Sequence, residues 1–516
     1  MSRWLRAPRA LLALALAGCC AAPPPRLAQP APPAPSPRPP APDVPPPDAP
    51  APAPAPPPVA MDWAAAGIDW SQPPPPWPEP RFTPPIPVTF TLPSGAQVYL
   101  VENHRLPLVS VRVLHGAAGS REDGPRPGLA ALTADLLDEG AGGRGAIELA
   151  EELERLGARL SIAAGVDRAT LVLETLAETL EPSLALAADV ILRPHLAEAD
   201  FARVKAERLA DLALRPDSPR AIAGVVFEQL VFAGHPYASP GAGWLDTVEA
   251  LTLADVKAFW STRYAPRAAS IVVAGAVTRP QLEAMLRRTW GGWKGAARPA
   301  PTPRRPGVRA PVLAFVDRPG APQSVITIGR LGPDARDKDR APLDLANTAV
   351  GGSFAARLNA RLREELGYTY GAFSSVWRGA HAGAWSVSTS VRTDVTAASI
   401  REILAILAAS TAAPLPADEL ERARALMVRG LPQDFETNGA TAAAYAGLIG
   451  DGRPLTTYRD LPAQLARVDA ARAQRAAAAQ FRELSVVVVG DWAVVGKELE
   501  ALGLPVVRYR ADGRPQ

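Results

Sequence analysis

Patterns of apolar residues with strand and helix periodicity predict a regular series of elements from about residue 85 onward. The clearest hairpin lies at 90–101, where Pro93-Ser-Gly95 provides a turn between two apolar runs. The elements expected after it are, in order, a strand at 108–114, helices at 129–138 and 146–156, strands at 159–164 and 170–176, helices at 180–191, 199–214 and 253–263, a strand at 270–275 and a helix at 281–290.

The second part of the chain repeats this order. The strand Ser-Ile-Val-Val-Ala-Gly recurs 215 positions later as Ser-Val-Val-Val-Val-Gly, and one helix start recurs 219 positions later. Chance likeness between short apolar strands is the alternative, but similar spacings at separate places favour a duplicated α+β domain. The matching pairs are 270–275 with 485–490, 196–203 with 415–422, and 180–191 with 398–407.

A proline-rich stretch separates the two repeats. Residues 296–306 read Ala-Ala-Arg-Pro-Ala-Pro-Thr-Pro-Arg-Arg-Pro, a composition typical of a linker. We therefore expect one domain at 85–296, a linker at 297–310 and a second domain at 311–512.

The first 18 residues have the pattern of a bacterial secretory signal. Arg3, Arg6 and Arg9 give a positive start, and the apolar run at 11–17 is too short to span a bilayer. The run ends in Leu-Ala-Gly-Cys19, which resembles a lipobox. We expect a signal peptide at 1–18 and a lipid on Cys19; the alternative is an ordinary cleaved signal beside a chance cysteine.

The two cysteines of the chain, Cys19 and Cys20, are adjacent. This arrangement offers no disulfide framework, no catalytic thiol and no cysteine metal site. Cys20 rather than Asp follows the lipidated position, which by resemblance to known sorting signals favours the outer membrane, facing the periplasm. Since no other stretch reaches about 18 apolar residues free of charges, no transmembrane helix is expected.

Residues 19–84 are expected to form a disordered tether. The stretch at 21–58 is almost entirely Pro and Ala, so it cannot bury a core and should extend as polyproline II. A spacer that holds the globular part away from the membrane is the favoured interpretation, and a ligand for proline-binding modules is the alternative. Trp63, Trp70 and Trp77 follow it and are candidates to pack on the globular part.

Charge and histidine placement exclude several kinds of site. Lys and Arg number 55 against 52 Asp and Glu, and no basic run has interleaved aromatic residues, so a nucleic acid partner is not expected. No Gly-x-Ser-x-Gly elbow is present. The five histidines show no spacing of three or four, so none is predicted to bind a metal; they are His104, His115, His195, His235 and His381.

Residues 350–371 form the most distinctive segment. They read Val-Gly-Gly-Ser-Phe-Ala-Ala-Arg-Leu-Asn-Ala-Arg-Leu-Arg-Glu-Glu-Leu-Gly-Tyr-Thr-Tyr-Gly. This segment resembles the C-terminal domain of the insulinase/pitrilysin family of zinc peptidases, as do the strand and helix within 486–504. The resemblance covers about residues 85–510 and implies an α+β fold of two homologous domains, each a mostly antiparallel sheet covered by helices.

Active members of that family carry His-x-x-Glu-His on one helix and a further Glu on a later helix. Two imidazoles and a carboxylate hold zinc there, and the intervening Glu takes a proton from the bound water. In this chain the two histidine positions fall on Ala131 and Asp135, and the general base falls on Ala134. The third ligand falls on Ala206 or, with a slip of one, on Glu207. The resemblance thus implies that this chain binds no zinc by itself.

Arg363 and Tyr370 match a pair that the family carries on its C-terminal domain. In active relatives the pair is implied to bind the substrate backbone and to help stabilise the oxyanion, and both side chains are suitable donors. The structural alternative is a surface ion pair for Arg363 and a core strand that begins at Tyr370.

The family encloses peptides between four such domains, supplied by one long chain or by two shorter ones. A chain that keeps the Arg–Tyr pair without ligands is therefore expected to be a non-catalytic subunit. Its partner would be a zinc-bearing homologue, its substrates unfolded peptides, and the zinc would sit in the partner. Two alternatives remain: a non-enzymatic envelope scaffold or peptide-binding lipoprotein, and an active peptidase with an unusual site.

Overall fold

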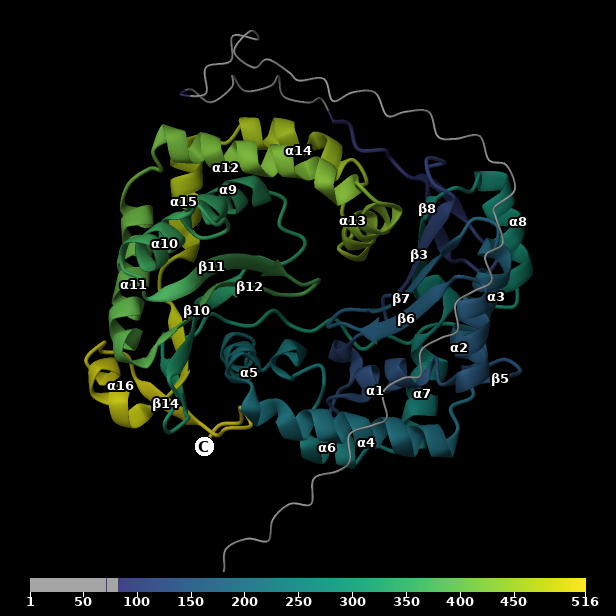
Figure 1. Cartoon of the computed structure of the whole chain (residues 1–516), viewed down its shortest axis with the longest axis horizontal. Helices are drawn as coiled ribbons and strands as arrows, with labels where there is room; N and C mark the ends of the chain where they lie inside the picture. The colour runs from purple at the N-terminus through teal and green to yellow at the C-terminus, as the bar shows by residue number, and fades with distance from the viewer. Residues whose placement is uncertain (1–70, 72–81) are drawn as a thin grey trace, which may run out of the picture. The chain divides into compact units, whose positions relative to one another are not determined.

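Two six-stranded sheets with matching strand order form the framework of the protein (Figure 1). The computed structural model describes Ser71 and residues 82–516, so the predicted signal peptide, Cys19 and nearly all of the expected tether lie outside the described residues. The first sheet has the order β1 (Val88–Thr91), β2 (Gln97–Glu102), β8 (Ala269–Gly275), β3 (Leu108–His115), β7 (Ala169–Leu176), β6 (Arg159–Ala164). The second has the order β14 (Val506–Tyr509), β9 (Leu313–Asp317), β13 (Ser485–Gly490), β10 (Gln323–Gly332), β12 (Gly383–Arg392), β11 (Thr369–Arg378).

Strand pairing confirms a mostly antiparallel α+β fold in duplicate. Each sheet contains an equivalent parallel pair, β2 with β8 in the first and β9 with β13 in the second. On the inner side of each pair the next strand is antiparallel: β3 to β8 and β10 to β13. The outermost strands differ, because β1 is antiparallel to β2 whereas β14 is parallel to β9. The expected first hairpin is confirmed, and its turn places Gly95 at φ +92°, a conformation that favours glycine.

Helices follow the strands in the same order in the two halves, which we define as residues 82–296 and 311–516. The first half contains α1 (Leu129–Leu136), α2 (Ala146–Arg155), α3 (Leu180–Leu192), α4 (Glu198–Leu214), α5 (Pro219–Val231), α6 (Leu245–Glu249), α7 (Leu253–Arg263) and α8 (Arg279–Trp290), with a small ribbon of β4 (Gly140–Ala141) and β5 (Arg144–Gly145). The second half contains α9 (Arg340–Val350), α10 (Arg357–Asn359), α11 (Thr396–Ala412), α12 (Ala417–Gly430), α13 (Asn438–Gly450), α14 (Thr457–Ala466), α15 (Ala470–Gln480) and α16 (Trp492–Glu500).

The two halves exchange one helix each. Helix α5 of the first half lies on the second sheet, where Val226 and Phe227 share a buried cluster with Val325 and Val487. Helix α13 of the second half lies on the first sheet in the same way (Figure 1). The buried residues contributed there are Ala442, Tyr445 and Leu448 from α13 and Leu114, Val272 and Ala274 from the sheet. Each half therefore completes the core of the other.

Equivalent side chains begin these two helices. Ser218 accepts a hydrogen bond from the Ala221 amide at 3.3 Å, and Thr437 accepts one from the Ala440 amide at 3.0 Å. Such caps satisfy one of the free amides at a helix start. The two caps lie 219 positions apart, the spacing that the sequence repeat predicted for the preceding helices.

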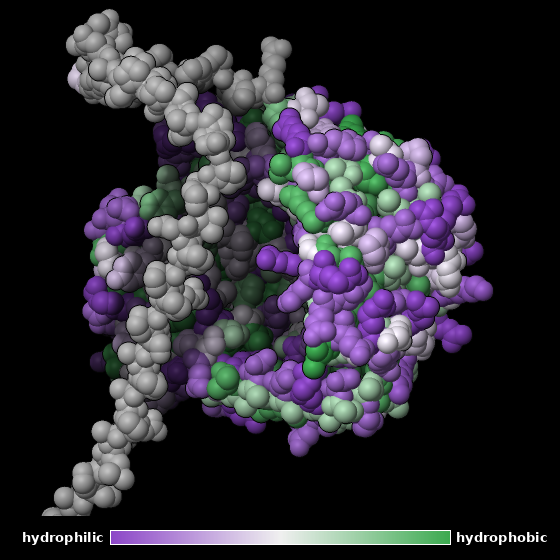
Figure 2. Space-filling view, turned by 45° about the vertical axis from the view of Figure 1, so that its right-hand side comes forward, coloured by the Kyte–Doolittle hydropathy of each residue, from purple (hydrophilic) through white to green (hydrophobic). Residues whose placement is uncertain are grey.

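One helical stretch among the described residues, Thr393–Ala412, is long and apolar enough to cross a membrane by length and composition. It comprises α11 and the turn before it, and it contains Arg401 and Glu402. Ile400, Ile403 and Leu407 are buried in the core of the second half, as is typical of a core helix. Figure 2 shows a largely hydrophilic outer face, hollowed toward the middle, where hydrophobic residues are visible.

Candidate functional site

Helix α1 carries the positions of the expected zinc motif. It begins after Gly128, which has φ +100°, and the Asp123 carboxylate accepts hydrogen bonds from the Gly128 and Ala130 amides, both at 2.8 Å. Burial raises the pKa of Asp123 to about 7, against the opposing effect of these amides. The start of α1 is thus fixed by these hydrogen bonds. Whether the helix can bind a metal depends on the side chains that follow.

The side chains of α1 do not fit a zinc ion. Ala131 and Ala134 are buried and provide no lone pair, and Asp135 accepts a hydrogen bond from the Arg208 guanidinium of α4. A zinc site needs three or four N, O or S donors, and here a fixed cation already occupies the one carboxylate. Within residues 82–516 no group of three or more His, Cys, Asp or Glu side chains is placed to hold a metal.

The structure places the expected third-ligand positions away from α1. Ala206 is exposed, and Glu207 is exposed and bonds to Arg203 at 3.0 Å along α4. It is Arg208 that points to Asp135. Since side chains three apart share a helix face, Asp211 lies on the same side of α4 as Arg208. Neither Ala206 nor Glu207 is therefore brought together with Ala131 and Asp135.

The histidines do not gather at one place, although His235 and His381 both bond to Tyr237, His381 through its backbone amide. His115 is fully buried, with both ring nitrogens lacking a hydrogen-bond partner among the described residues, and burial lowers its pKa to about 3. Its ring packs 4.7 Å from Tyr264 and 5.7 Å from Trp293, centroid to centroid. His195 contacts the Gly142 carbonyl at 2.9 Å, and the ring of His235 accepts a hydrogen bond from the Tyr237 amide. His104 and His381 lie near the surface, beside Glu102 and Arg336 respectively.

Arg363 lies in a turn of π-helix, Ala360–Glu365. Such turns interrupt the regular helical repeat and occur frequently at functional sites. The guanidinium lies 4.4 Å above the ring of Phe354 and 3.3 Å from the Glu364 carboxylate. Arg363 remains partly exposed, and a guanidinium has five N–H donors, so it can donate to a bound group besides Glu364.

Tyr370 sits on a β-bulge at the start of β11, where the register with β12 shifts between Thr369 and Ala372. Its side chain is 91% exposed and does not enter the core. The bulge is fixed by the Thr369 hydroxyl, which accepts from the Gly371 amide at 3.0 Å, and by Thr389, which donates to the Gly371 carbonyl at 2.9 Å. Bulges re-aim a side chain, and this one directs Tyr370 out of the sheet.

Asn359 connects the loop before Arg363 to the bulge. It is fully buried, accepts a hydrogen bond from the Ala372 amide at 2.8 Å and donates to the Ser353 carbonyl at 3.4 Å. One amide side chain therefore holds the backbone just before Phe354 and the backbone just after Tyr370. The sequence analysis gave no role to Phe354 or Asn359; both lie inside the distinctive segment, but residue spacing alone does not reveal their contacts.

The edge of the second sheet adds a further surface beside Tyr370. Strand β11 has β12 as its one strand neighbour, and part of its other edge is already bonded, because the Ser374 amide donates to the Gly351 carbonyl at 2.8 Å and the Ala372 amide donates to Asn359. Phe373 and Trp377 follow Tyr370 along the strand and are 46% and 40% exposed. Arg363, Tyr370 and this edge together provide donors and apolar contacts for an extended chain.

Comparison with known families agrees with this architecture. The family described as Insulinase (Peptidase family M16) matches residues 98–222, and the family described as Peptidase M16 inactive domain matches residues 250–427. The chain belongs to the insulinase family of metallopeptidase-like proteins. The predicted family and fold are thereby confirmed.

Relatives carry both peptidase and non-peptidase names. An uncharacterized zinc protease of Mycobacterium leprae is 29% identical over 301 residues, 58% of this chain and 67% of that protein. Zinc protease PqqE of Helicobacter pylori is 23% identical over 70% of this chain and 82% of its own length. The non-peptidase homolog YmxG of the same organism is 27% identical over 30% of this chain and 36% of its own.

Solved structures show the same fold. A peptidase M16 inactive domain from Pseudomonas fluorescens superposes with a TM-score of 0.74 at 25% identity, over 78% of this chain and 98% of its own. A protease from Helicobacter pylori superposes with a TM-score of 0.75 at 21% identity, over 79% of this chain and all of its own. At that lower identity the likeness concerns the fold alone.

Proposed function

We propose that this protein is the non-catalytic subunit of a hetero-oligomeric zinc peptidase. One observation carries the proposal: a bulge holds Tyr370 out of the sheet shortly after the π-helical turn of Arg363, while the zinc-motif helix offers two alanines and an aspartate bound to Arg208. The chain thus has hydrogen-bond donors suited to a peptidase site, Arg363 and Tyr370, but lacks the metal ligands of such a site. A zinc-bearing homologue supplies the metal and the general base, and this chain supplies Arg363 and Tyr370.

Arg363 and Tyr370 stabilise negative charge in this proposal. A guanidinium and a phenol both donate hydrogen bonds to an oxyanion that forms when a peptide carbonyl is attacked. The contact with the Phe354 ring orients Arg363 before substrate binds. The side chain therefore loses less conformational entropy when it bonds to the substrate. Because the two groups do not themselves generate a nucleophile, they enhance cleavage only when a metal site faces them.

The substrate in this proposal is an unfolded peptide in extended form. Arg363 and Tyr370 offer donors to the backbone carbonyls of any sequence, and Phe373 and Trp377 offer apolar contact. Such recognition suits chains that lack their own secondary structure.

The expected lipid on Cys19 places the protein on the outer membrane, facing the periplasm. A lipidated subunit with a Pro/Ala tether then holds a soluble zinc-bearing partner near the envelope. Replacement of Cys19 by Ser is expected to release both subunits from washed membranes together. A partner that stays on the membrane in the C19S strain contradicts the tethering role.

An envelope scaffold or peptide-binding lipoprotein is the second candidate. It is favoured by the non-peptidase name of one relative and by the exposed aromatic side chains of β11, Phe373 and Trp377. Affinity purification of the full chain from detergent-solubilised membranes, followed by mass spectrometry, separates the two. The subunit proposal expects a homologue with an intact His-x-x-Glu-His motif in near-equal amount, and the scaffold expects none.

A further inference from the structure

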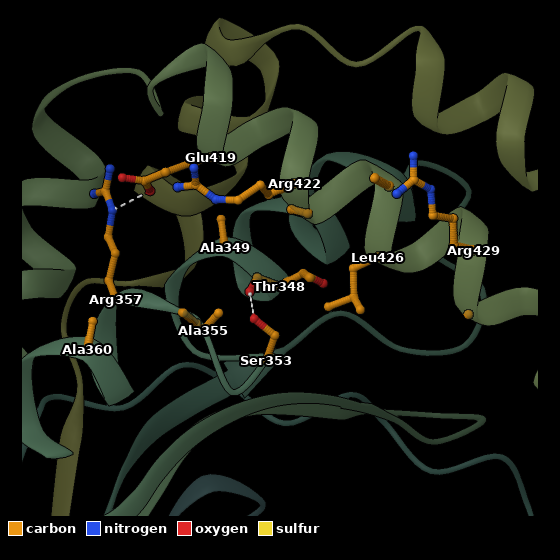
Figure 3. A pocket seen from close by; sticks show the side chains of 14 residues that line it. Thr348, Ala349, Ser353, Ala355, Arg357, Ala360, Glu419, Arg422, Leu426 and Arg429 are labelled. Carbon is orange, nitrogen blue, oxygen red and sulfur yellow. Dashed lines mark hydrogen bonds and ion pairs between the residues drawn. The ribbon is translucent and has the colours of Figure 1, made fainter. Parts of the chain in front are cut away.

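A cavity of about 680 Å³ lies beside α12, and three arginines line part of its wall (Figure 3). These arginines already have partners within the chain. Arg357 pairs with Glu419 at 2.7 Å, as a dashed line in Figure 3 marks, and Arg422 pairs with Asp418 at 2.6 Å. Arg429 is engaged as well. Since these charges are already satisfied, the cavity does not call for a charged ligand.

Two arginines elsewhere in the second half lack such partners. Arg340 is the first residue of α9, and Arg453 lies in the loop between α13 and α14. Both are partly buried, yet neither guanidinium has a hydrogen bond or an ion pair with any described residue. A charged group that is partly removed from water without an acceptor costs free energy. An acceptor from outside the chain is therefore expected to bind at these side chains.

Arg378, at the end of β11, reaches the first turn of α9. Its side chain is 7% exposed, and its guanidinium donates to the Asp344 carboxylate at 2.7 Å. Asp344 lies four residues after Arg340 on α9, so the two share one helix face. The Nε atoms of Arg378 and Arg340 are both buried, and neither has an acceptor among the described residues. Unused donors of two guanidinium groups thus gather at the start of α9.

Arg453 belongs to the same group. Helix α9 packs on both β11 and α14, and Arg453 lies shortly before α14 begins. Burial and then the neighbouring Arg453 and Arg378 lower the pKa of Arg340, and burial likewise lowers the pKa of Arg453. Because like charges repel strongly only at short range, the three guanidinium groups lie close together. We call Arg340, Arg378 and Arg453 the arginine cluster.

The carboxylates beside the arginine cluster do not balance its charge. Those that act on Arg340 and Arg453 are Asp344 and Asp451. Asp344 is bonded to Arg378, and Asp451 pairs at 3.2 Å with Arg168, which belongs to the first half. Four arginines therefore share two carboxylates, which leaves a surplus of two positive charges. Helix α9 adds to the attraction for an anion, because no side chain caps its first amides.

We propose that the arginine cluster binds a phosphate group. A guanidinium presents paired N–H donors that match two oxygens of a phosphate, and a phosphate dianion balances the surplus of two charges. Arg340 and Arg453 bond to the phosphate with their unused donors, and Arg378 contributes its charge and its Nε. The site involves neither Arg363 nor Tyr370 and is independent of the proposed peptidase partner.

Isothermal titration calorimetry on the full chain carrying C19S tests the proposal, with inorganic phosphate up to about 10 mM and potassium chloride at equal ionic strength as the control. One saturable site with a Kd of about 0.1–1 mM is expected for phosphate, with a rise in melting temperature, and neither effect for chloride. Glycerol 2-phosphate distinguishes the sources of the group. Equal binding of this ester assigns the site to a phosphate carried by a larger molecule, and binding of inorganic phosphate alone assigns it to the free ion.

The variants R340Q and R453Q each remove one cationic donor and should weaken phosphate binding at least about tenfold. Thermal denaturation without phosphate should show both to be at least as stable as wild type, because neither arginine has a partner to lose. R475Q, at an exposed arginine outside the cluster, is the matched control and should bind phosphate as wild type does.

Three results overturn the proposal. The first is a wild type that shows no saturable response to either phosphate compound, or the same response to chloride. The second is phosphate binding by R340Q and R453Q that equals that of wild type. The third is a loss of stability in both variants without phosphate, which would mean that contacts within the chain already hold these arginines.

Discussion

Helices α1 and α4 of the first half and α9 and α12 of the second half hold equivalent places in a duplicated fold, but their chemistry has diverged. The first pair keeps the position of a zinc motif and fills it with two alanines and an Asp135–Arg208 ion pair. The second pair leaves a cavity, and a partly exposed Arg363 and a fully displayed Tyr370 follow α10 along the chain. One framework thus supports a surface closed by an ion pair in one half and an open, donor-bearing surface in the other. The framework itself does not determine the chemistry.

The largest expected effect comes from restoring ligands to α1. The variant A131H/A134E/D135H/R208A supplies two imidazoles and removes the competing cation, while Asp211 remains on the α4 face that looks at α1. Its affinity for Zn²⁺ is expected to rise roughly a thousandfold over wild type. Equilibrium dialysis with metal analysis measures this. R208A alone is the matched control and should not bind zinc. If the full variant binds zinc no better than wild type, the backbone of α1 and α4 no longer has the geometry of a zinc site.

The exchange of α5 and α13 predicts that the two halves unfold together. Phe227 of α5 is buried in the core of the second half, so F227A should lower the free energy of unfolding by about 3–5 kcal/mol. Urea denaturation followed by tryptophan fluorescence reports on both halves, because Trp290 and Trp385 are each fully buried. A single transition at lower urea is expected. L245A, at an exposed position, should cost little, and separate transitions for the halves would break the account.

Asn359 should stabilise the bulge that displays Tyr370. N359A leaves the buried Ala372 amide without its acceptor, at a cost of about 1–3 kcal/mol. Denaturant unfolding measures that loss, and exchange of the Ala372 amide proton should become faster. S375A, at an exposed position on the same strand, is the control. If neither the stability nor the amide exchange changes, Asn359 does not stabilise the bulge.

His115 makes the first half sensitive to acid. Burial lowers its folded pKa to about 3, so the unfolded chain binds a proton below about 6.5 that the folded chain does not. Stability is therefore fully present above pH 6.5 and is lost as the pH falls, by about 1.4 kcal/mol per unit from this residue. H115F should flatten the pH dependence of unfolding between pH 6 and pH 4. H104F, at an exposed site, should not alter the slope.

The repeat and the order of elements along the chain could be predicted because they depend on local periodicity. Apolar strands such as 270–275 and 485–490 are buried on both faces, which gives continuous apolar runs that are easy to match. The first hairpin followed from the turn at Gly95. The family resemblance of residues 350–371 was confirmed for the same reason, since it depends on a fixed order of residue types.

Helix rotation and long-range packing could not be predicted in this way. Helix α4 carries charged residues on several faces, namely Arg203, Lys205, Glu207 and Arg208. The spacing of its apolar residues therefore does not show which face is turned toward α1. The sequence therefore did not indicate that Arg208, next to Ala206 and Glu207, bonds to Asp135. The sequence of α13 indicates burial, but nothing local indicates that it covers the sheet of the other half.

The bulge at Tyr370 also escaped prediction. Its cause is the pair of threonine hydroxyls on neighbouring strands, Thr369 and Thr389, which bond to Gly371. Those contacts depend on the register of β11 and β12, which residue spacing along one strand does not specify. The sequence therefore left open whether Tyr370 is buried or displayed.

The central claim is that this chain contributes Arg363 and Tyr370 to a zinc site carried by its partner. The most direct measurement is the steady-state rate of peptide cleavage by the reconstituted pair with wild type, R363A or Y370F, with association measured on the same samples. The account predicts a fall in kcat of about a hundredfold for R363A, with binding of the partner intact, and no loss for R475A, an exposed arginine elsewhere. Cleavage at the wild-type rate by an R363A/Y370F complex, or chelator-sensitive cleavage by this chain alone, would contradict it.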